Sequence, residues 1–275
     1  MKFLEKLNTI IEKNNSLLSI GLDPNMEKIP EFLRSREYSF FEFNKAIVTL
    51  TSDLVCAFKP NSAFYEALGV EGINQLKMTC DYIREQYPDV VIILDAKRAD
   101  IGSTNEGYAQ FVFEYLRADA ITVNPYLGEE ALEPFLQYED KGIIVLCHTS
   151  NPGADEFQNL IVDGEELYKH VARNVSKKWN KNNNCLLVVG ATYPDEIRAV
   201  RDIVGDMTIL VPGIGAQGGD LEKTLQAGLN KDNNGLIIHS GREIIYASNQ
   251  EAFADIAREK ALELRDTINR IRSNI

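Results

Sequence analysis

The sequence predicts a closed (β/α)8 barrel, a TIM barrel that forms one domain over residues 1–275. Three observations predict this fold class. Short apolar runs, many of them β-branched, recur along the whole chain, and the stretches between them are long enough for helices. Polar residues whose side chains could take part in catalysis follow several of these runs directly. No linker rich in Pro, Gly or Ser divides the chain, and barrels of this length are commonly single domains.

The apolar runs are the expected strands. Continuous apolar runs fit strands that are buried on both faces, as in a parallel sheet whose strands are connected by helices. The expected strands cover residues 17–22, 54–58, 90–94, 120–123, 142–146, 186–189, 208–211 and 236–238.

Helical spacing occurs between and after these runs. Phe64, Leu68 and residues 73–78 are spaced as one apolar face of a helix. Near the chain end, Ser248 and Glu251 form a capping-box pattern, and apolar residues follow at three- and four-residue steps. We therefore expect a last helix that begins there and packs on the outside of the barrel.

A doubly wound open sheet is the alternative architecture, because it has the same alternation of strands and helices. Periodicity does not separate the two. The polar residues favour the closed barrel, since they end several strands spread along the whole chain, and a barrel gathers its active site from the carboxyl ends of many strands.

The bulk composition narrows the partners and the compartment. With 44% hydrophobic and 25% charged residues, the chain has the composition of an ordinary globular protein, and its net charge of −12 argues against nucleic acid or an anionic membrane as partner. The N-terminal segment carries charge every few residues, unlike a signal peptide or a membrane span. We expect a cytoplasmic protein with reduced cysteines, which are Cys56, Cys80, Cys147 and Cys185.

Four charged residues end two of the expected strands. Asp95, Lys97 and Asp100 follow one strand and Lys59 follows the strand before it. Asp95 and Lys97 are two residues apart, so in an extended chain their side chains point to the same face. Charges gathered at one barrel mouth are costly unless they pair, and two Lys with two Asp satisfy that requirement. A solvated charged loop is the competing interpretation.

The segments LDAKRADIGST and FKPN, which contain these four residues, resemble the signature of orotidine 5'-phosphate decarboxylases, and the overall length resembles their longer, type 2 subgroup. The resemblance extends over nearly the whole chain. It implies that Lys59, Asp95, Lys97 and Asp100 form a catalytic tetrad that decarboxylates orotidine 5'-monophosphate to UMP in pyrimidine biosynthesis, without a cofactor. Lys97 would stabilise the carbanion at C6 of the pyrimidine and donate the proton.

Further segments resemble the substrate-binding motifs of the same family. GLDPN implies a residue for the ribose hydroxyls, TSNPGA one for the pyrimidine, and VPGIGAQGGD with SGR a phosphate site. The family also implies a homodimer in which Asp100 and the ribose-binding Thr104 reach the partner's site. The substrate-binding residues are then Asp23, Thr104, Ser150, Gln217, Gly241 and Arg242.

The sequence offers little support for a dinucleotide or a metal site. Residues 213–218 fit GxGxxG, but this match comes late in the chain, which argues against a dinucleotide site. His148, His170 and His239 lack metal-ligand spacing, so no metal is expected. His170 and His239 are interpreted as structural histidines.

Three alternative functions remain. A Schiff-base aldolase could use Lys97 or Lys59, although two adjacent Asp residues would oppose the lowered pKa that such a lysine needs. A decarboxylase of a related sugar acid would need a metal and would leave the segment around Ser150 unexplained. A non-catalytic nucleotide-binding barrel is the alternative from another class, and the intact tetrad argues against it.

Overall fold

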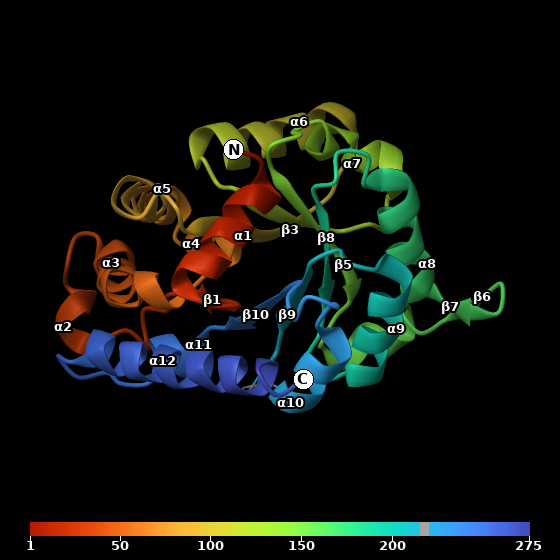
Figure 1. Cartoon of the computed structure of the whole chain (residues 1–275). Helices are drawn as coiled ribbons and strands as arrows, with labels where there is room; N and C mark the ends of the chain where they lie inside the picture. The colour runs from red at the N-terminus through yellow and green to blue at the C-terminus, as the bar shows by residue number, and fades with distance from the viewer. Residues whose placement is uncertain (215–219) are drawn as a thin grey trace.

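The structure, a computed structural model, describes residues 1–214 and 220–275. Its strands form a closed parallel barrel in the order β1-β10-β9-β8-β5-β4-β3-β2 (Figure 1). This closed order confirms the predicted barrel and rules out the open doubly wound sheet. The barrel strands are β1 (Leu18–Gly21), β2 (Ala57–Lys59), β3 (Val91–Arg98), β4 (Ala120–Val123), β5 (Gly142–His148), β8 (Cys185–Val189), β9 (Ile209–Pro212) and β10 (Leu236–Ser240).

The strands are buried on both faces, as their continuous apolar sequences predict. Every residue of β1, β4, β8 and β10 is buried. In a barrel, one face of each strand fills the interior and the surrounding helices cover the other, so neither face can be polar along its whole length. Leu146 on β5 and Pro212 on β9 are half-buried, and the carboxyl end of β3 becomes exposed after Asp95.

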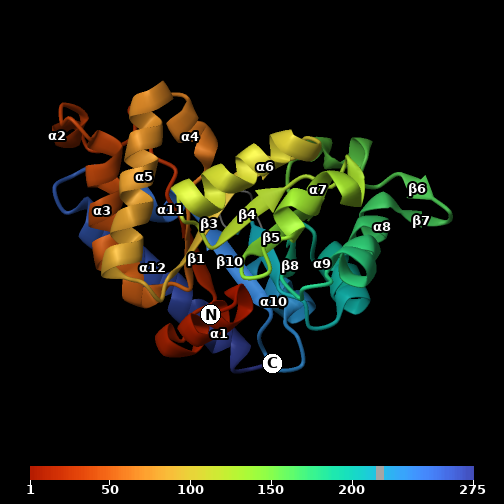
Figure 2. The same cartoon turned by 90° about the horizontal axis from the view of Figure 1, so that it is seen from above.

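Helices fill the connections and surround the barrel (Figure 2). Within the described part of the chain, no helix is both long and apolar enough to cross a membrane. The helices are α1 (Phe3–Asn14), α2 (Glu31–Arg34), α3 (Ser39–Thr51), α4 (Ser62–Glu66), α5 (Gly69–Gln86), α6 (Gly102–Gln110), α7 (Gly128–Leu136), α8 (Leu167–Asn174), α9 (Pro194–Val204), α10 (Leu221–Gly228), α11 (Arg242–Ile245) and α12 (Phe253–Arg272).

Helix α1 packs at the amino ends of the strands, opposite the end where the charged residues lie. The ring of Phe3 lies so close to Gly142, at the start of β5, that a Cβ there would be 2.7 Å from a ring carbon. Lys6 Nζ lies 2.9 Å from Asp119 Oδ2, just before β4, and both side chains are buried. An apolar contact and a buried ion pair therefore hold α1 against this end of the barrel.

The last helix packs where the sequence predicts, but its start was predicted wrongly. Helix α12 buries Phe253, Ala257 and Ile268 and contacts α3, α10 and α11. It begins at Phe253 without a side-chain cap. Ser248 instead accepts a hydrogen bond from the backbone N–H of Gln250 at 3.2 Å, a local turn that uses the hydroxyl before the helix begins.

The helical region after β2 also differs from the prediction. It consists of two helices, α4 and α5, and two of the apolar residues on which the prediction rested, Phe64 and Leu68, are each 37% exposed. Within the predicted segment 73–78, Leu76 is buried, and the other buried residues include Tyr65 on α4 and Ile83 on α5. The break between the helices changes the phase of the apolar face, which a single helical period cannot reproduce.

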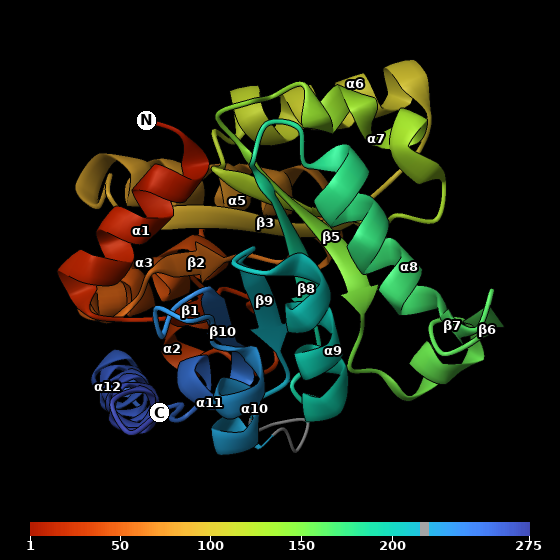
Figure 3. The ribbon, with the colours of Figure 1, turned by 45° about the vertical axis from the view of Figure 1, so that its right-hand side comes forward.

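The connection between β5 and β8 is long. It contains a 3-10 turn (Pro152–Glu156), a small antiparallel hairpin of β6 (Ile161–Val162) and β7 (Glu165–Glu166), helix α8 and a π-helical turn (Val175–Trp179). The hairpin projects from the body of the molecule (Figure 3). Residues on either side of the 3-10 turn, Ser150 and Gln158, line the cavity at the barrel mouth.

Candidate active site

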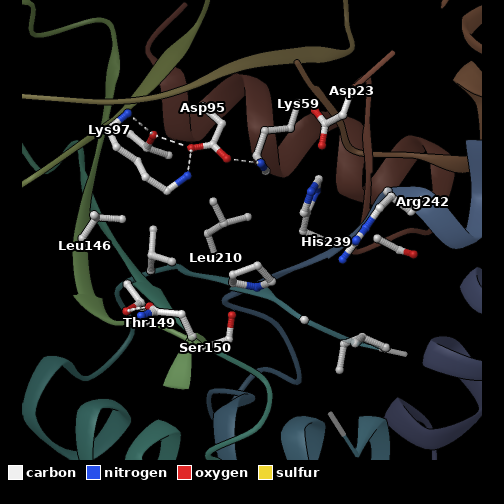
Figure 4. A pocket seen from close by; sticks show the side chains of 18 of the residues that line it. Asp23, Lys59, Asp95, Lys97, Leu146, Thr149, Ser150, Leu210, His239 and Arg242 are labelled. Atoms are coloured by element: carbon white, nitrogen blue, oxygen red, sulfur yellow. Dashed lines mark hydrogen bonds and ion pairs between the residues drawn. The ribbon is translucent and has the colours of Figure 1, made fainter. Parts of the chain in front are cut away.

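A cavity of about 480 Å³ opens at the carboxyl ends of the barrel strands (Figure 4). Its volume lies in the range of small-molecule sites, and its location is where barrels carry their active sites. Residues from all eight strands or the loops that follow them contribute to its wall. They include Asp23, Lys59, Asp95, Lys97, Thr122, Leu146, Ser150, Val188, Leu210, Pro212, His239, Gly241 and Arg242.

Asp95 lies between two lysines at one side of this cavity. Its Oδ2 is 2.7 Å from Lys59 Nζ and its Oδ1 is 2.6 Å from Lys97 Nζ. The side chains of Asp95 and Lys59 are buried, whereas that of Lys97 is 49% exposed and faces the cavity. The structure therefore brings three of the four expected residues into one alternating array, with one ammonium accessible to a ligand.

The charge of Asp95 is fixed by this arrangement. Burial alone would raise the pKa of its carboxyl group, because a charged group is less stable away from water. The ammonium groups of Lys59 and Lys97 outweigh burial, both by their charge and by their hydrogen bonds, and hold the pKa of Asp95 well below its ordinary value. Asp95 is therefore an anion throughout the physiological pH range.

The backbone of Lys97 has an unusual conformation that directs its side chain. Its φ is +47°, in the left-handed region, and the pairing of β3 with β4 shifts register between Leu94 and Arg98. A non-glycine residue in this region is strained by about 1–3 kcal/mol and persists only where its surroundings hold it. Strand β3 was expected to end at residue 94, and the bulge explains how it continues while turning Lys97 into the cavity.

Thr122 holds this bulge. Its Oγ1 accepts hydrogen bonds from the backbone N–H groups of Ala96 and Lys97, each at 3.0 Å, and donates one to Asp95 Oδ1 at 2.9 Å. The sequence does not distinguish Thr122 from other strand residues, because a threonine is common inside an apolar β-branched run. Only its place at the carboxyl end of the expected strand 120–123 could have indicated it.

Asp23 lies beside Lys59, at the end of this array away from Lys97 (Figure 4). Its Oδ1 accepts a hydrogen bond from the backbone N–H of Asn61 at 3.1 Å, and Tyr246 Oη donates to its backbone carbonyl at 2.7 Å. Burial raises the pKa of Asp23 above its ordinary value, and the nearby Lys59 opposes that shift. The carboxylate is thus held in place at the edge of the cavity.

Ser150 lies on the opposite wall of the cavity (Figure 4). It packs directly on Gly190 after β8, where a Cβ would be 2.7 Å from that of Ser150. The preceding Thr149 is clamped by Gln158, whose Oε1 accepts from the Thr149 N–H and whose Nε2 donates to its hydroxyl, both at 2.8 Å. The long connection after β5 therefore fixes the position of Ser150.

Arg242 lines the cavity on the side of Asp23 and His239 (Figure 4). It is the first residue of α11 and follows Gly241, which also lines the cavity. A Cβ on Gly241 would lie 3.8 Å from Asp23 Oδ2, so this turn is close to the ribose-binding candidate. Gln217, the other expected phosphate-binding residue, lies outside the described residues.

Asp100 and Thr104 do not join the other site residues within one chain. Neither is among the residues that line the cavity. The backbone of Asp100 is held by Asn105, which accepts from its N–H at 2.9 Å, and the Asp100 carboxylate accepts from the N–H of Ile101 at 2.7 Å. Thr104 is exposed on α6.

The histidines differ from one another. His170 Nε2 is 2.8 Å from the carbonyl oxygen of Val162, in keeping with a structural role. His239, expected to be structural as well, faces the cavity instead. Among the residues outside 215–219, no cluster of three or more His, Cys, Asp or Glu side chains could hold a metal ion.

Comparison with known proteins gives consistent matches over the whole chain. A model of the orotidine 5'-phosphate decarboxylase / HUMPS family matches residues 16–256. The orotidine 5'-phosphate decarboxylase of Dechloromonas aromatica (strain RCB) is 53% identical over 269 residues, covering 98% of this chain and 99% of that protein. That of Cellvibrio japonicus (strain Ueda107) is 52% identical over 271 residues, 98% of each chain. The structure of Leishmania donovani OMP decarboxylase superposes with a TM-score of 0.87 at 37% identity, covering 99% of both chains.

Proposed function

This chain belongs to the orotidine 5'-phosphate decarboxylase / HUMPS family and is a carboxy-lyase, and we propose that it makes UMP with a tetrad of Lys59, Asp95, Lys97 and Asp100. Its substrate is orotidine 5'-monophosphate, and its product belongs to pyrimidine biosynthesis. The observation that carries the assignment of residues is the pair of ion contacts at Asp95, 2.7 Å to Lys59 and 2.6 Å to Lys97.

Lys97 is the proton donor of the proposed mechanism. The bond between C6 and the carboxylate breaks, CO2 leaves, and the electron pair stays on C6. The ammonium group of Lys97 stabilises this charge and then transfers its proton to C6. Two facts support this role: the side chain is half exposed to the cavity, and its backbone is held in a strained conformation by Thr122.

Asp95 and Lys59 have supporting roles. A permanently charged Asp95 near the substrate carboxylate repels it, and that repulsion is relieved as CO2 departs. Asp95 also holds the ammonium group of Lys97 at 2.6 Å, so that it remains aimed at C6. Lys59, which is buried, balances the charge of Asp95 and keeps the array in register.

The rest of the cavity fits the remaining parts of the nucleotide. In this proposal, Ser150 binds the pyrimidine and Asp23 binds the ribose hydroxyls. Arg242, Gly241 and Gln217 bind the phosphate. The labelled side chains among these lie on different sides of one cavity in Figure 4, which supports a ligand that spans it. Binding energy from the distant phosphate can then be used to orient and desolvate the reacting end.

A homodimer with shared sites completes the proposal. Asp100 has no contact with Lys59 or Lys97 of its own chain in the described part of the structure. Large apolar side chains are exposed around it: Ile101 is 60% exposed, and Tyr126, after the neighbouring strand β4, is 83% exposed. Exposed apolar residues at the same edge of the barrel fit a subunit interface, across which Asp100 and Thr104 would reach the partner's site.

Mixing two inactive variants tests the shared site. Lys97→Ala and Asp100→Ala impair different members of the tetrad, and in a hybrid dimer one of the two sites has neither change. Random reassociation makes about half of the dimers hybrids, so activity should return to about a quarter of the wild-type value. No recovery after mixing, or a monomer by sedimentation, would refute the shared site.

Decarboxylation itself is tested by following the ultraviolet absorbance of orotidine 5'-monophosphate as it becomes UMP. Wild-type protein should turn the substrate over. Lys97→Ala should lose nearly all activity while keeping the circular dichroism of the wild type, and Lys13→Ala, at an exposed ion pair with Asp89, should keep full activity. If the wild-type protein bound UMP but did not turn over orotidine 5'-monophosphate, it would be a non-catalytic nucleotide-binding barrel instead.

The compartment is part of the proposal as well. All four cysteines are buried and unpaired, which fits the reducing cytoplasm.

A further inference from the structure

His239 occupies a position in the cavity that none of the roles above requires. It lies on β10, two residues before Gly241, and lines the cavity between the side of Lys59 and the side of Arg242 (Figure 4). In the proposed function, the reacting C6 lies at Lys97 and the phosphate at Arg242. The part of the nucleotide between them is the ribose, so His239 faces the middle of the ligand.

Strand β1 is shaped to accommodate the imidazole ring. Ser19 lies opposite His239 in the strand register, and Ser19 Oγ is 3.4 Å from Nδ1. Two residues further along β1, a Cβ on Gly21 would be 3.0 Å from Cε1 and 3.2 Å from Nε2 of the ring. Any residue other than glycine at position 21 would therefore crowd the ring.

These contacts orient the two ring nitrogens. Ser19 lies deeper in the barrel than Gly21, because the cavity is at the carboxyl ends of the strands. The ring therefore rises from Nδ1 beside Ser19 to Nε2 beside Gly21, toward the cavity. With Nδ1 beside the Ser19 hydroxyl, Nε2 is the ring nitrogen left to meet a ligand.

The ring is neutral. Burial lowers the pKa of His239 well below its ordinary value, and the charge of Lys59 lowers it further. A neutral imidazole offers one donor and one acceptor. It suits a hydroxyl or ether oxygen, and it adds no positive charge beside Lys59.

We propose that His239 binds the ribose of the substrate through Nε2 and thereby sets the distance between the phosphate at Arg242 and C6 at Lys97. This inference rests on the proposed function and adds a ribose contact from β10, the strand next to β1 in the barrel. The expected contribution is that of one buried neutral hydrogen bond, which corresponds to about a five- to tenfold change in affinity.

The experiment compares three ligands by calorimetry on the full chain: UMP, ribose 5-phosphate and inorganic phosphate, the weaker two in competition with UMP. His239→Leu should weaken UMP and ribose 5-phosphate by about five- to tenfold each and leave inorganic phosphate within about twofold. His239→Gln, which keeps a neutral hydrogen-bonding group, should recover part of the loss.

Two outcomes would overturn the inference. Unchanged UMP affinity in His239→Leu would show that the ring does not contact the ligand. An equal loss for all three ligands would show that the change distorts the phosphate site or the whole cavity. Because these titrations need no turnover, a failure of decarboxylation in the wild type would refute the proposed function separately.

Discussion

Replacing Asp95 by asparagine tests the charge array through stability as well as activity. The side chain keeps its size and one acceptor oxygen, but the negative charge between two ammonium groups is lost. Lys59 then becomes a buried cation without its partner, since its side chain is only 5% exposed. Lys97 is affected less, because its half-exposed ammonium group remains in contact with water.

The magnitude follows from these exposures. Removing one partner of a buried ion pair costs about 3–5 kcal/mol, whereas the pair with the half-exposed Lys97 contributes about 1 kcal/mol or less. We therefore expect Asp95→Asn to lower the free energy of unfolding by roughly 3–5 kcal/mol at pH 7, mostly through Lys59. Decarboxylation should be nearly abolished at the same time.

The expected loss depends on pH with a definite sign. The pKa of Asp95 is lower in the folded than in the unfolded chain, so its contribution is complete above the ordinary carboxyl pKa of about 4. It disappears as the pH falls from there toward the lower pKa of the folded state. The stability difference between wild type and Asp95→Asn should be constant from about pH 8 to pH 5 and shrink below about pH 4.

Urea unfolding followed by circular dichroism measures this difference. The matched control is Asp89→Asn, which removes an exposed pair with Lys13, both partners being more than half exposed, and should cost less than about 1 kcal/mol. If Asp95→Asn cost no more than this control, the array would not be the buried, charge-balanced unit described here. A difference that stays constant below pH 4 would refute the lowered pKa.

Three further predictions concern other parts of the chain. Arg242→Ala should lower kcat/KM by about two decades or more, because phosphate binding contributes to the transition state; steady-state kinetics showing near-wild-type turnover would remove Arg242 from the site. Gly190→Ala should raise KM, since its new Cβ would lie 2.7 Å from that of Ser150 and displace it. It should also lower the free energy of unfolding by about 1–3 kcal/mol. An unchanged KM would show that Ser150 does not contact the substrate. Arg201→Met should lower the free energy of unfolding by about 3 kcal/mol or more in urea titrations, with little effect on kcat. The reason is that the buried guanidinium donates hydrogen bonds to the carbonyls of residues 205, 207, 228 and 235. A loss under about 1 kcal/mol would show that water replaces the guanidinium group.

Much of the barrel could be predicted from the sequence, because strands that are buried on both faces consist of continuous apolar runs. The run at 120–123 matches β4 at both ends, and the other strands differ only at their termini. Lys59, Asp95 and Lys97 could be proposed as a group for a similar reason: each stands where an apolar run ends, and in a parallel barrel all such ends meet at one face.

Features that depend on contacts between distant segments were not predictable. The capping pattern at Ser248 was misleading because its hydroxyl accepts a hydrogen bond within a turn, and the helix that packs on α3 begins later, at Phe253. Thr122 and His239 stand at the ends of apolar runs, but that place alone does not indicate their roles. Their roles come from the register of β4 against β3 and of β10 against β1, which places a hydroxyl under Asp95 and an imidazole over Gly21.

The sequence by itself determined that strands and helices alternate along this chain and that charged residues end several strands, which favours a closed barrel with these residues at its mouth. Only the tertiary structure decided that Lys97 takes a left-handed conformation at a bulge, that Thr122 holds it, and that His239 faces the cavity. The reason is that periodicity along a chain reports which residues are buried, whereas strand register and side-chain direction are set by neighbours far away in sequence.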